Sequence, residues 1–375
     1  MERVTDLLAK ELKKSGKDVI LLYSVPNRLN KEYISPVPIY RLPKKYPQKF
    51  FLDLIKKNNI NLIIDQTEGG VVGPYGYFKK RPTELAKVFL LAVQHSSRRA
   101  VLSNITQIYG KTGKGIAGNL AAKIYNQTVL RIRNLHFLWV ARMVHRNLDK
   151  NYDRTIVLSK AIIKDFKHYY PKADTNKIIA IPNPNTYEPG QHSCMKKRVL
   201  FVGRVKNNPK GVDKLLRIWS MVEREFPDWE LDIVGDGEDL LGLERTAKDM
   251  KLKNVVFHGF QNPEPFYLKA SIMCMTSLYE GFPMVLNEAM VHGVVPIVFN
   301  SFGSAGDIVV DGECGFLIKP FDEKEFANKL STLMNSEDTL SKMSRNAMSH
   351  SKMFSRDNIR NLWLKLFDSL SEKNE

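Results

Sequence analysis

The chain has 375 residues, with 43% hydrophobic and 26% charged side chains, the composition of a folded globular protein of about two domains. These values exclude disordered, collagen-like and fibrous classes, and three scattered cysteines argue against a disulfide framework or a zinc cluster. The formal net charge of +17 indicates an anionic partner, whether nucleic acid, an anionic membrane or a phosphorylated substrate.

The first half of the chain alternates between helical and strand-like patterns. An amphipathic helix opens the chain and ends near Gly16, and the apolar run after it predicts a buried strand over 18–23. A helical pattern occupies 160–170. This alternation predicts a doubly wound α/β domain with a parallel sheet over residues 1–183. The further strand-like runs are 60–65, 88–93, 154–159 and 177–182.

The first half is also strongly basic. Residues 1–195 contain 33 Lys and Arg against 14 Asp and Glu, whereas residues 196–375 contain 24 against 26. Within the basic half, the segment 119–147 mixes large apolar side chains such as Phe137 and Trp139 with arginines. This composition suits a helix lying at a membrane surface, and the alternative is a core-facing helix with a solvated basic side.

A polar segment rich in Pro, Asn and Gly follows at 184–197 and predicts an interdomain linker. The alternation then restarts and predicts a second doubly wound α/β domain over 198–348. In such a pair of domains a ligand binds in the cleft between them, at the carboxyl ends of the strands. The strand-like runs of the second domain are 198–203, 230–235, 254–259, 271–276 and 294–299.

Two strand ends of the second domain carry residues suited to a diphosphate. Gly203 lets the backbone approach a ligand closely, and Arg204 and Lys210 supply positive charge, although an ordinary solvated loop would contain the same residues. Asp236 opens an acidic run after the next strand. Such a run could bind a divalent metal, but a tight turn into a helix needs the same residues, and we expect the turn.

The segment YEGFPMVLNEAM, at 279–290, is the most informative in the chain. Pro283 fits the first position of a helix and Gly293 fits its end. The unpaired N–H groups near Met284 and Val285 would then face the strand ends and form a seat for a phosphate.

Glu280 precedes this predicted helix and Glu288 lies inside it. The two carboxylates could accept hydrogen bonds from two sugar rings, one on each side of a bound phosphate. Two surface acids on an amphipathic helix are the alternative.

Six segments of the second half together resemble the C-terminal domain of family-4-type glycosyltransferases, which have the GT-B fold. The match covers nearly all of 198–320, and its Glu-x7-Glu element is fairly specific. Residues 354–370 resemble the final helices of that fold, so we expect 349–375 to pack back on the N-terminal domain. The six segments are GRVKNNPKG (203–211), IVGDGED (233–239), VVFHGF (255–260), YEGFPMVLNEAM (279–290), GVVPIVF (293–299) and DGECGFLI (311–318).

The resemblance implies a polysaccharide-type glycosyltransferase of the bacterial kind. It would move a sugar from a UDP- or GDP-sugar to a lipid-linked or polysaccharide acceptor, with retention of anomeric configuration and without a metal or other cofactor. Arg204 and Lys210 would neutralise the leaving diphosphate, where developing charge needs prepositioned cations. Glu280 would hold the donor sugar, Glu288 would bind the ribose, and the loop at Phe260 would lie near the base. The other donor-binding positions that the match implies are Gly203, Asp236, Gly281, Phe282, Pro283, Met284 and Val285.

In the first half, the strand at 88–93 runs into His95. This residue resembles the family's cleft histidine near the transferred sugar, and a purely structural role is the alternative. With Glu280, Arg204 and Lys210, it completes the set that we expect to be catalytic.

Family members usually begin with a strand and a glycine pair, followed by a helix like that of residues 2–19. This chain starts at the helix. The first strand of a doubly wound sheet is central, so its absence would leave its neighbours unpaired. Either the start as written lies downstream of the true one, or the N-terminal domain is rearranged. We expect the chain as written to be less stable and less active than a version that carries the strand.

Three other functions compete with sugar transfer. One is a different reaction on the same fold, such as that of a sugar-nucleotide epimerase or a glycosyl phosphorylase. Another is a non-catalytic relative that binds a membrane or a protein partner. Nucleic-acid binding ranks lowest, because the chain has no zinc-finger, RNP-type or basic leucine-zipper pattern. The acidic residues at the N-terminus argue against a signal peptide, so we expect a cytoplasmic protein, peripheral at the inner face of the cell membrane.

Overall fold

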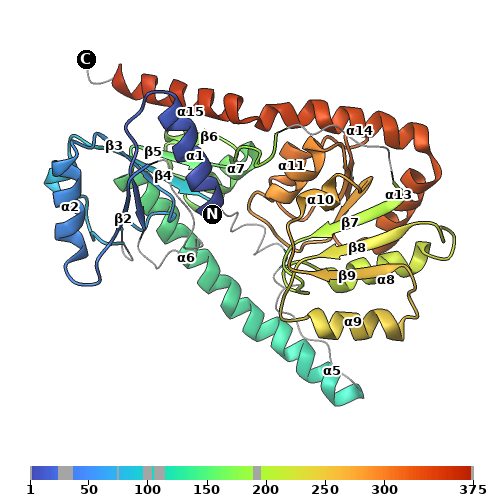
Figure 1. Cartoon of the computed structure of the whole chain (residues 1–375). Coiled ribbons are helices and arrows are strands. Elements are labelled where there is room, and N and C mark those ends of the chain that lie inside the picture. Colours follow the sequence, from blue (N-terminus) through green and yellow to red (C-terminus); the bar gives the residue numbers. More distant parts are fainter. Residues whose placement is uncertain are drawn as a thin grey trace. The chain divides into compact units, whose positions relative to one another are not determined.

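The computed structural model describes residues 2–23, 37–73, 76–95, 104, 115–188 and 196–372. The chain folds into two compact units (Figure 1). The C-terminal helix groups with the first unit, whereas residues 96–138 group with the second, although we had expected 1–183 to be one domain. Unit 1 consists of Met1–His95, Trp139–Thr186 and Phe354–Glu375, and unit 2 of Ser96–Leu138 and Tyr187–Met353.

The described strands of unit 1 form two separate parallel sheets. β1 (Leu21–Tyr23) pairs with β2 (Ile39–Arg41), and four strands form the second sheet in the order β3-β4-β5-β6. The second sheet consists of β3 (Leu62–Asp65), β4 (Phe89–Gln94), β5 (Arg154–Val157) and β6 (Ile178–Ala180). Four of these six strands lie within predicted runs, and β4 extends one residue beyond the run predicted at 88–93. β2 was not predicted, because its three residues end in an arginine and form no apolar run.

The described strands of unit 1 are divided between two sheets, and each sheet has its own edges. In the described part of this unit, β1 pairs only with β2, and β3 pairs only with β4. Leu62, Ile63 and Ile64 of β3 are half-buried, whereas Leu90 and Leu91 of the neighbouring β4 are fully buried. Among the described strands, β3 is therefore an edge strand of its sheet and is less covered than β4.

The C-terminal helix is an integral part of unit 1. α15 (Arg356–Ser371) packs against α1 (Glu2–Lys14), and the Arg360 guanidinium donates to Glu11 at 3.1 Å. Arg356 donates to the carbonyl oxygens of Asn185 and Thr186. The chain thus returns to unit 1 after completing unit 2. Two further helices of this unit are α2 (Pro47–Lys57) and α7 (Lys160–Tyr169).

One long helical segment lies between β4 and β5 in the sequence. It consists of α5 (Gly115–Ile124), a π-helical turn over Tyr125–Val129, and α6 (Leu130–Asn151). Figure 1 shows α5 and α6 in line. In the part of the chain that the structure describes, no helix is both long enough and apolar enough to cross a membrane.

Unit 2 is built on one six-stranded parallel sheet in the order β12-β11-β10-β7-β8-β9. Its strands are β7 (Arg198–Val202), β8 (Glu230–Val234), β9 (Val255–Gly259), β10 (Ile272–Met275), β11 (Val295–Phe299) and β12 (Phe316–Ile318). Its helices over 212–351 are α8 (Val212–Val222), α9 (Leu240–Asp249), α10 (Glu264–Tyr267), α11 (Met284–Val291), α12 (Ala305–Ile308), α13 (Glu323–Asn335) and α14 (Glu337–Ser351).

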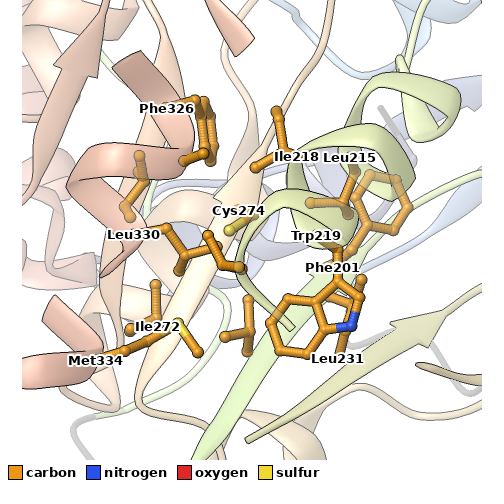
Figure 2. Close-up of a cluster of buried hydrophobic side chains, with 14 of the residues drawn as sticks. Phe201, Leu215, Ile218, Trp219, Leu231, Ile272, Cys274, Phe326, Leu330 and Met334 are labelled. Atoms are coloured by element: carbon orange, nitrogen blue, oxygen red, sulfur yellow. The ribbon is translucent and has the colours of Figure 1, made fainter. Parts of the chain in front are cut away.

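The core of unit 2 follows from helical and strand periodicity. α8 buries Leu215, Ile218 and Trp219, a spacing that places them on one face of the helix. This face packs on the sheet together with Phe326 and other apolar residues of α13 (Figure 2). This packed core holds the strands in place, and the polar loops emerge from the carboxyl ends of these strands.

Candidate active site

The candidate site of unit 2 lies where three neighbouring strands end. β10, β7 and β8 are adjacent in the sheet, and all are parallel, so the loops that follow them emerge at the same edge. The loop after β7 contains Gly203 to Gly211, the loop after β8 begins at Gly235, and the loop after β10 leads through Glu280 to α11.

Glycines allow these loops to approach one another closely. Gly235 has φ 142°, and a Cβ atom at this position would lie 1.8 Å from the carbonyl oxygen of Gly203. Gly211 has φ 65°, and its Cβ would lie 2.2 Å from the carbonyl oxygen of Thr276. A side chain at either position would therefore push the loops apart. In addition, the Leu278 N–H donates to the Pro209 carbonyl at 2.7 Å, which joins the loops after β10 and β7.

This backbone contact brings two predicted site residues together. The ammonium group of Lys210 donates to Glu280 Oε1 at 2.7 Å, and the two side chains are only 24% and 14% exposed. A half-buried cation of this kind is held in place, so it can meet an anion without being reorganised. The pairing of Lys210 with Glu280 was not predicted from the sequence.

Other predicted donor-site residues lie on the same edge but make different contacts. Arg204 is exposed, and Phe260, directly after β9, is 88% exposed. The Asp236 carboxylate accepts the N–H of Gly237 at 2.7 Å, and the Leu240 N–H donates to the Gly237 carbonyl at 3.2 Å in the turn predicted before α9. Beside it, a hydrogen bond from Lys206 holds the pKa of Glu238 below its usual value.

α11 starts one residue later than predicted. Pro283 is the residue before the helix rather than its first residue, with φ −71° and ψ 102°, and no side chain caps the helix. The N–H groups of Met284 and Val285 lie in the first turn, where an α-helix offers no internal acceptor. The helix ends at Val291, followed by Gly293 at φ 76°. The hydroxyl of Ser304 donates to the Gly281 carbonyl at 2.7 Å and fixes the loop before the helix.

Glu288 lies within α11 as predicted, but its environment was not foreseen. It is only 3% exposed, and its Oε2 accepts a hydrogen bond from the Tyr267 hydroxyl at 3.0 Å. The Tyr267 ring stacks on His292 with centroids 5.6 Å apart, and Tyr187 packs edge-on against both rings. Glu288 is therefore an anchored, buried carboxylate, whereas Glu280 pairs with a cation.

In unit 1, the structure places His95 directly after β4. Its backbone N–H donates to Glu68 at 3.0 Å, and its Nε2 lies 2.8 Å from Gln66 Oε1. Both partners lie on the loop after β3, the strand next to β4. Burial lowers the pKa of His95 below the ordinary value of 6.5, and the nearby Glu68 carboxylate opposes this shift.

Asp65, at the end of β3, holds the loop that carries these partners. Its carboxylate accepts hydrogen bonds from Thr67, from the Val71 N–H at 3.1 Å and from the Tyr152 hydroxyl. Glu68 has φ 57°, a left-handed conformation that costs a non-glycine residue energy and needs such support. Asp65 was not among the predicted site residues, although an acid that ends an apolar strand can be recognised in a sequence.

The C-terminal part of the chain matches a known family. Residues 187–350 match the family model described as Glycosyl transferases group 1, which confirms the resemblance for this segment. An uncharacterized glycosyltransferase of Haemophilus influenzae is 34% identical over 196 residues, which are 51% of this chain and 54% of that protein.

A Campylobacter jejuni protein is named a GalNAc-alpha-(1->4)-GalNAc-alpha-(1->3)-diNAcBac-PP-undecaprenol alpha-1,4-N-acetyl-D-galactosaminyltransferase. It is 31% identical over 168 residues, which are 45% of this chain and 47% of that protein. The chain thus spans about half the length of these curated relatives.

The similarity in structure extends over the whole chain. The Anabaena protein HepE, solved in complex with UDP and glucose, matches with a TM-score of 0.70 at 17% sequence identity. The match covers 98% of this chain and 96% of that protein. It confirms the α/β GT-B fold that the sequence predicted.

Replacing Gly235 with alanine tests the close approach of the loops. We expect Gly235→Ala to lower the free energy of unfolding by about 3 kcal/mol or more, because the new Cβ meets a backbone oxygen and not a flexible side chain. Gly242, on α9, has nothing within 4 Å of its Cβ position, so Gly242→Ala should raise stability by about 0.5–1 kcal/mol. Equal stabilities of the two variants in urea titration would contradict this account.

The environment of His95 gives a second prediction. An NMR titration should show a His95 pKa below 6.5, so that the ring is neutral at pH 7. Because the Glu68 carboxylate raises this pKa, Glu68→Gln should lower it further. A pKa at or above 6.5 in the unmodified protein would show that the ring is not desolvated as described.

Proposed function

We propose that this protein is a glycosyltransferase that moves a sugar from a nucleotide-sugar donor, a UDP- or GDP-sugar, to an acceptor hydroxyl with retention of configuration. The observation that carries the proposal is the Lys210–Glu280 pair at the carboxyl edge of the unit 2 sheet. The pair lies within the segment that matches the glycosyltransferase family. A fixed cation and a carboxylate, next to the start of a helix, are the groups needed to bind a sugar diphosphate.

In the proposed reaction, the bond between the anomeric carbon and the diphosphate oxygen breaks, and the oxygen keeps the electron pair. The acceptor hydroxyl oxygen forms the new glycosidic bond, and its proton passes to the departing phosphate. Negative charge therefore grows on the diphosphate, where Lys210 and Arg204 stabilise it. The N–H groups of Met284 and Val285 add a partial positive charge from the start of α11.

The remaining residues have roles on the donor. When the donor phosphate replaces Glu280 as the partner of the Lys210 ammonium, the Glu280 carboxylate can accept hydrogen bonds from the sugar hydroxyls. Glu288, within α11, would accept hydrogen bonds from the ribose hydroxyls, and the exposed Phe260 would lie near the base. His95 is assigned to the transferred sugar, and its neutral ring offers a hydrogen-bonding nitrogen without added positive charge.

We infer that the acceptor is lipid-linked or a polysaccharide, and that the reaction belongs to cell-surface polysaccharide synthesis at the inner face of the membrane. The Campylobacter relative, whose printed name specifies an undecaprenol-linked acceptor, supports this inference. The excess of basic residues in 1–195 supports an anionic membrane as the partner. We propose no metal or other cofactor, since Lys210 and Arg204 supply the charge that a divalent ion would otherwise provide.

Substitution of Lys210 tests the proposal. Release of nucleoside diphosphate is measured with a panel of UDP- and GDP-sugars and lipid-linked oligosaccharide acceptors, and NMR of the anomeric proton reports the configuration of the product. We expect Lys210→Ala to reduce turnover by about 10²–10³-fold, the effect of removing one transition-state donor.

Lys197 provides the matched control. It forms an ion pair with Asp228 at 3.1 Å, but both side chains are largely exposed and lie at the opposite edge of the sheet, so Lys197→Ala should leave turnover unchanged. The proposal fails if no nucleotide-sugar is consumed by the folded protein, or if Lys210→Ala is as active as the control. An inverted product would overturn the assignment of retention.

A further inference from the structure

The long helical segment 115–151 exposes an apolar face. Ile132 is 68% exposed, Leu135 is 60% exposed and Trp139 is 54% exposed. Their spacing of three and four residues places them in one stripe along α6. Ile124, at the end of α5, is a further exposed residue at 54%. We call Ile132, Leu135 and Trp139 the apolar stripe.

The apolar stripe is not the face that attaches the helix to the protein. Ala141 and Leu148 are fully buried, and Leu148 belongs to the core of unit 1. By helical geometry Ala141 lies about 180° around the axis from Ile132, on the opposite side of α6. The helix thus has two apolar faces, of which the protein covers one.

Positive charge surrounds the apolar stripe. The segment 115–151 contains six Lys and Arg residues and one acidic residue, Asp149. Arg131 and Arg133 are exposed and flank Ile132 at about 100° on either side of it. Such a helix, apolar in the middle and basic at both margins, fits a surface that is apolar inside and anionic at its rim.

We propose that the apolar stripe and its flanking arginines bind an anionic lipid bilayer, with α6 lying in the plane of the membrane. The apolar side chains enter the boundary between headgroups and acyl chains, and the arginines meet the lipid phosphates. A second copy of this chain fits the face poorly, because it would bring the same arginines together. Membrane binding by α6 would hold the enzyme where a lipid-linked acceptor lies, and only this purpose rests on the proposed function.

Vesicle co-sedimentation tests the proposal with the full chain and no donor. We expect binding to vesicles of phosphatidylcholine mixed with phosphatidylglycerol, little binding to phosphatidylcholine alone, and weakening by salt. The double substitution Ile132→Gln with Leu135→Gln should weaken binding about tenfold or more, because apolar area no longer leaves water. Leu241→Gln, at a site on α9 that is 69% exposed, is the matched control and should bind like the unmodified protein.

The arginines are tested in the same way. Arg131→Gln and Arg133→Gln should each weaken binding about fivefold, which corresponds to about 1 kcal/mol per charge at an anionic surface. The exposed pair Lys342 and Arg345 on α14 gives matched controls, Lys342→Gln and Arg345→Gln, with unchanged binding.

Trp139 supplies a direct signal. The chain has four tryptophans, and the other three, Trp219, Trp229 and Trp363, are buried. Fluorescence that shifts to the blue with vesicles and is quenched by brominated lipid should therefore come from Trp139, and Trp139→Phe should abolish it.

Three results would overturn the proposal. The first is that the protein fails to bind anionic vesicles at low salt. The second is that the stripe substitutions leave vesicle binding unchanged. The third is that these substitutions abolish self-association in sedimentation velocity while the protein still binds vesicles. A protein that binds vesicles through the stripe but transfers no sugar would refute the proposed function and leave the membrane surface standing.

Discussion

The site in unit 2 depends on how closely its strand-end loops approach one another. The backbone at Gly235 leaves no room for a side chain against Gly203, and Gly211 is in the same position against Thr276. The close approach of Gly211 to Thr276 brings the two loops together, and Lys210 Nζ lies 2.7 Å from Glu280 Oε1 although 70 residues separate them in the chain. The buried core formed by α8, α13 and the sheet fixes the strands from which the loops emerge. The Lys210 ammonium is thus positioned by the backbone packing of the loops together with its ion pair to Glu280.

In unit 1, hydrogen bonds position the candidate residue His95. The conformation of the loop after β3 rests on the Asp65 carboxylate, which accepts hydrogen bonds from the loop backbone and from Tyr152. Burial of the hydroxyl and the neighbouring Asp65 raise the pKa of Tyr152, so it stays a hydrogen-bond donor at neutral pH. The loop in turn presents Gln66 and Glu68 to His95. A hydrogen-bond network performs here the task that glycine contacts perform in unit 2.

Much of this could be predicted from local sequence. Apolar runs located ten of the strands, and the segment 279–290 located α11 to within one residue. β2 and β12 were not predicted, because neither lies in a longer apolar run, whereas the equally short β1 and β6 do. Contacts between distant residues could not be predicted, since the bond from Tyr267 to Glu288 depends on how α10 packs beside α11. The apolar residues of 119–147 were correctly noted as unusual, but only the structure shows that Ile132, Leu135 and Trp139 face outward.

We propose that the loops of unit 2 hold a nucleoside diphosphate with the ammonium of Lys210, which Glu280 holds in place, and with the exposed guanidinium of Arg204. The most direct test of this proposal is calorimetric titration of UDP, GDP and ADP, in the presence of EDTA, into the unmodified protein and into Lys210→Ala. We expect one of the nucleotides to bind without metal, and loss of the Lys210 ammonium to weaken binding about tenfold or more, as for other charged hydrogen bonds. Absence of binding by the folded protein, or equal binding by Lys210→Ala, would contradict it.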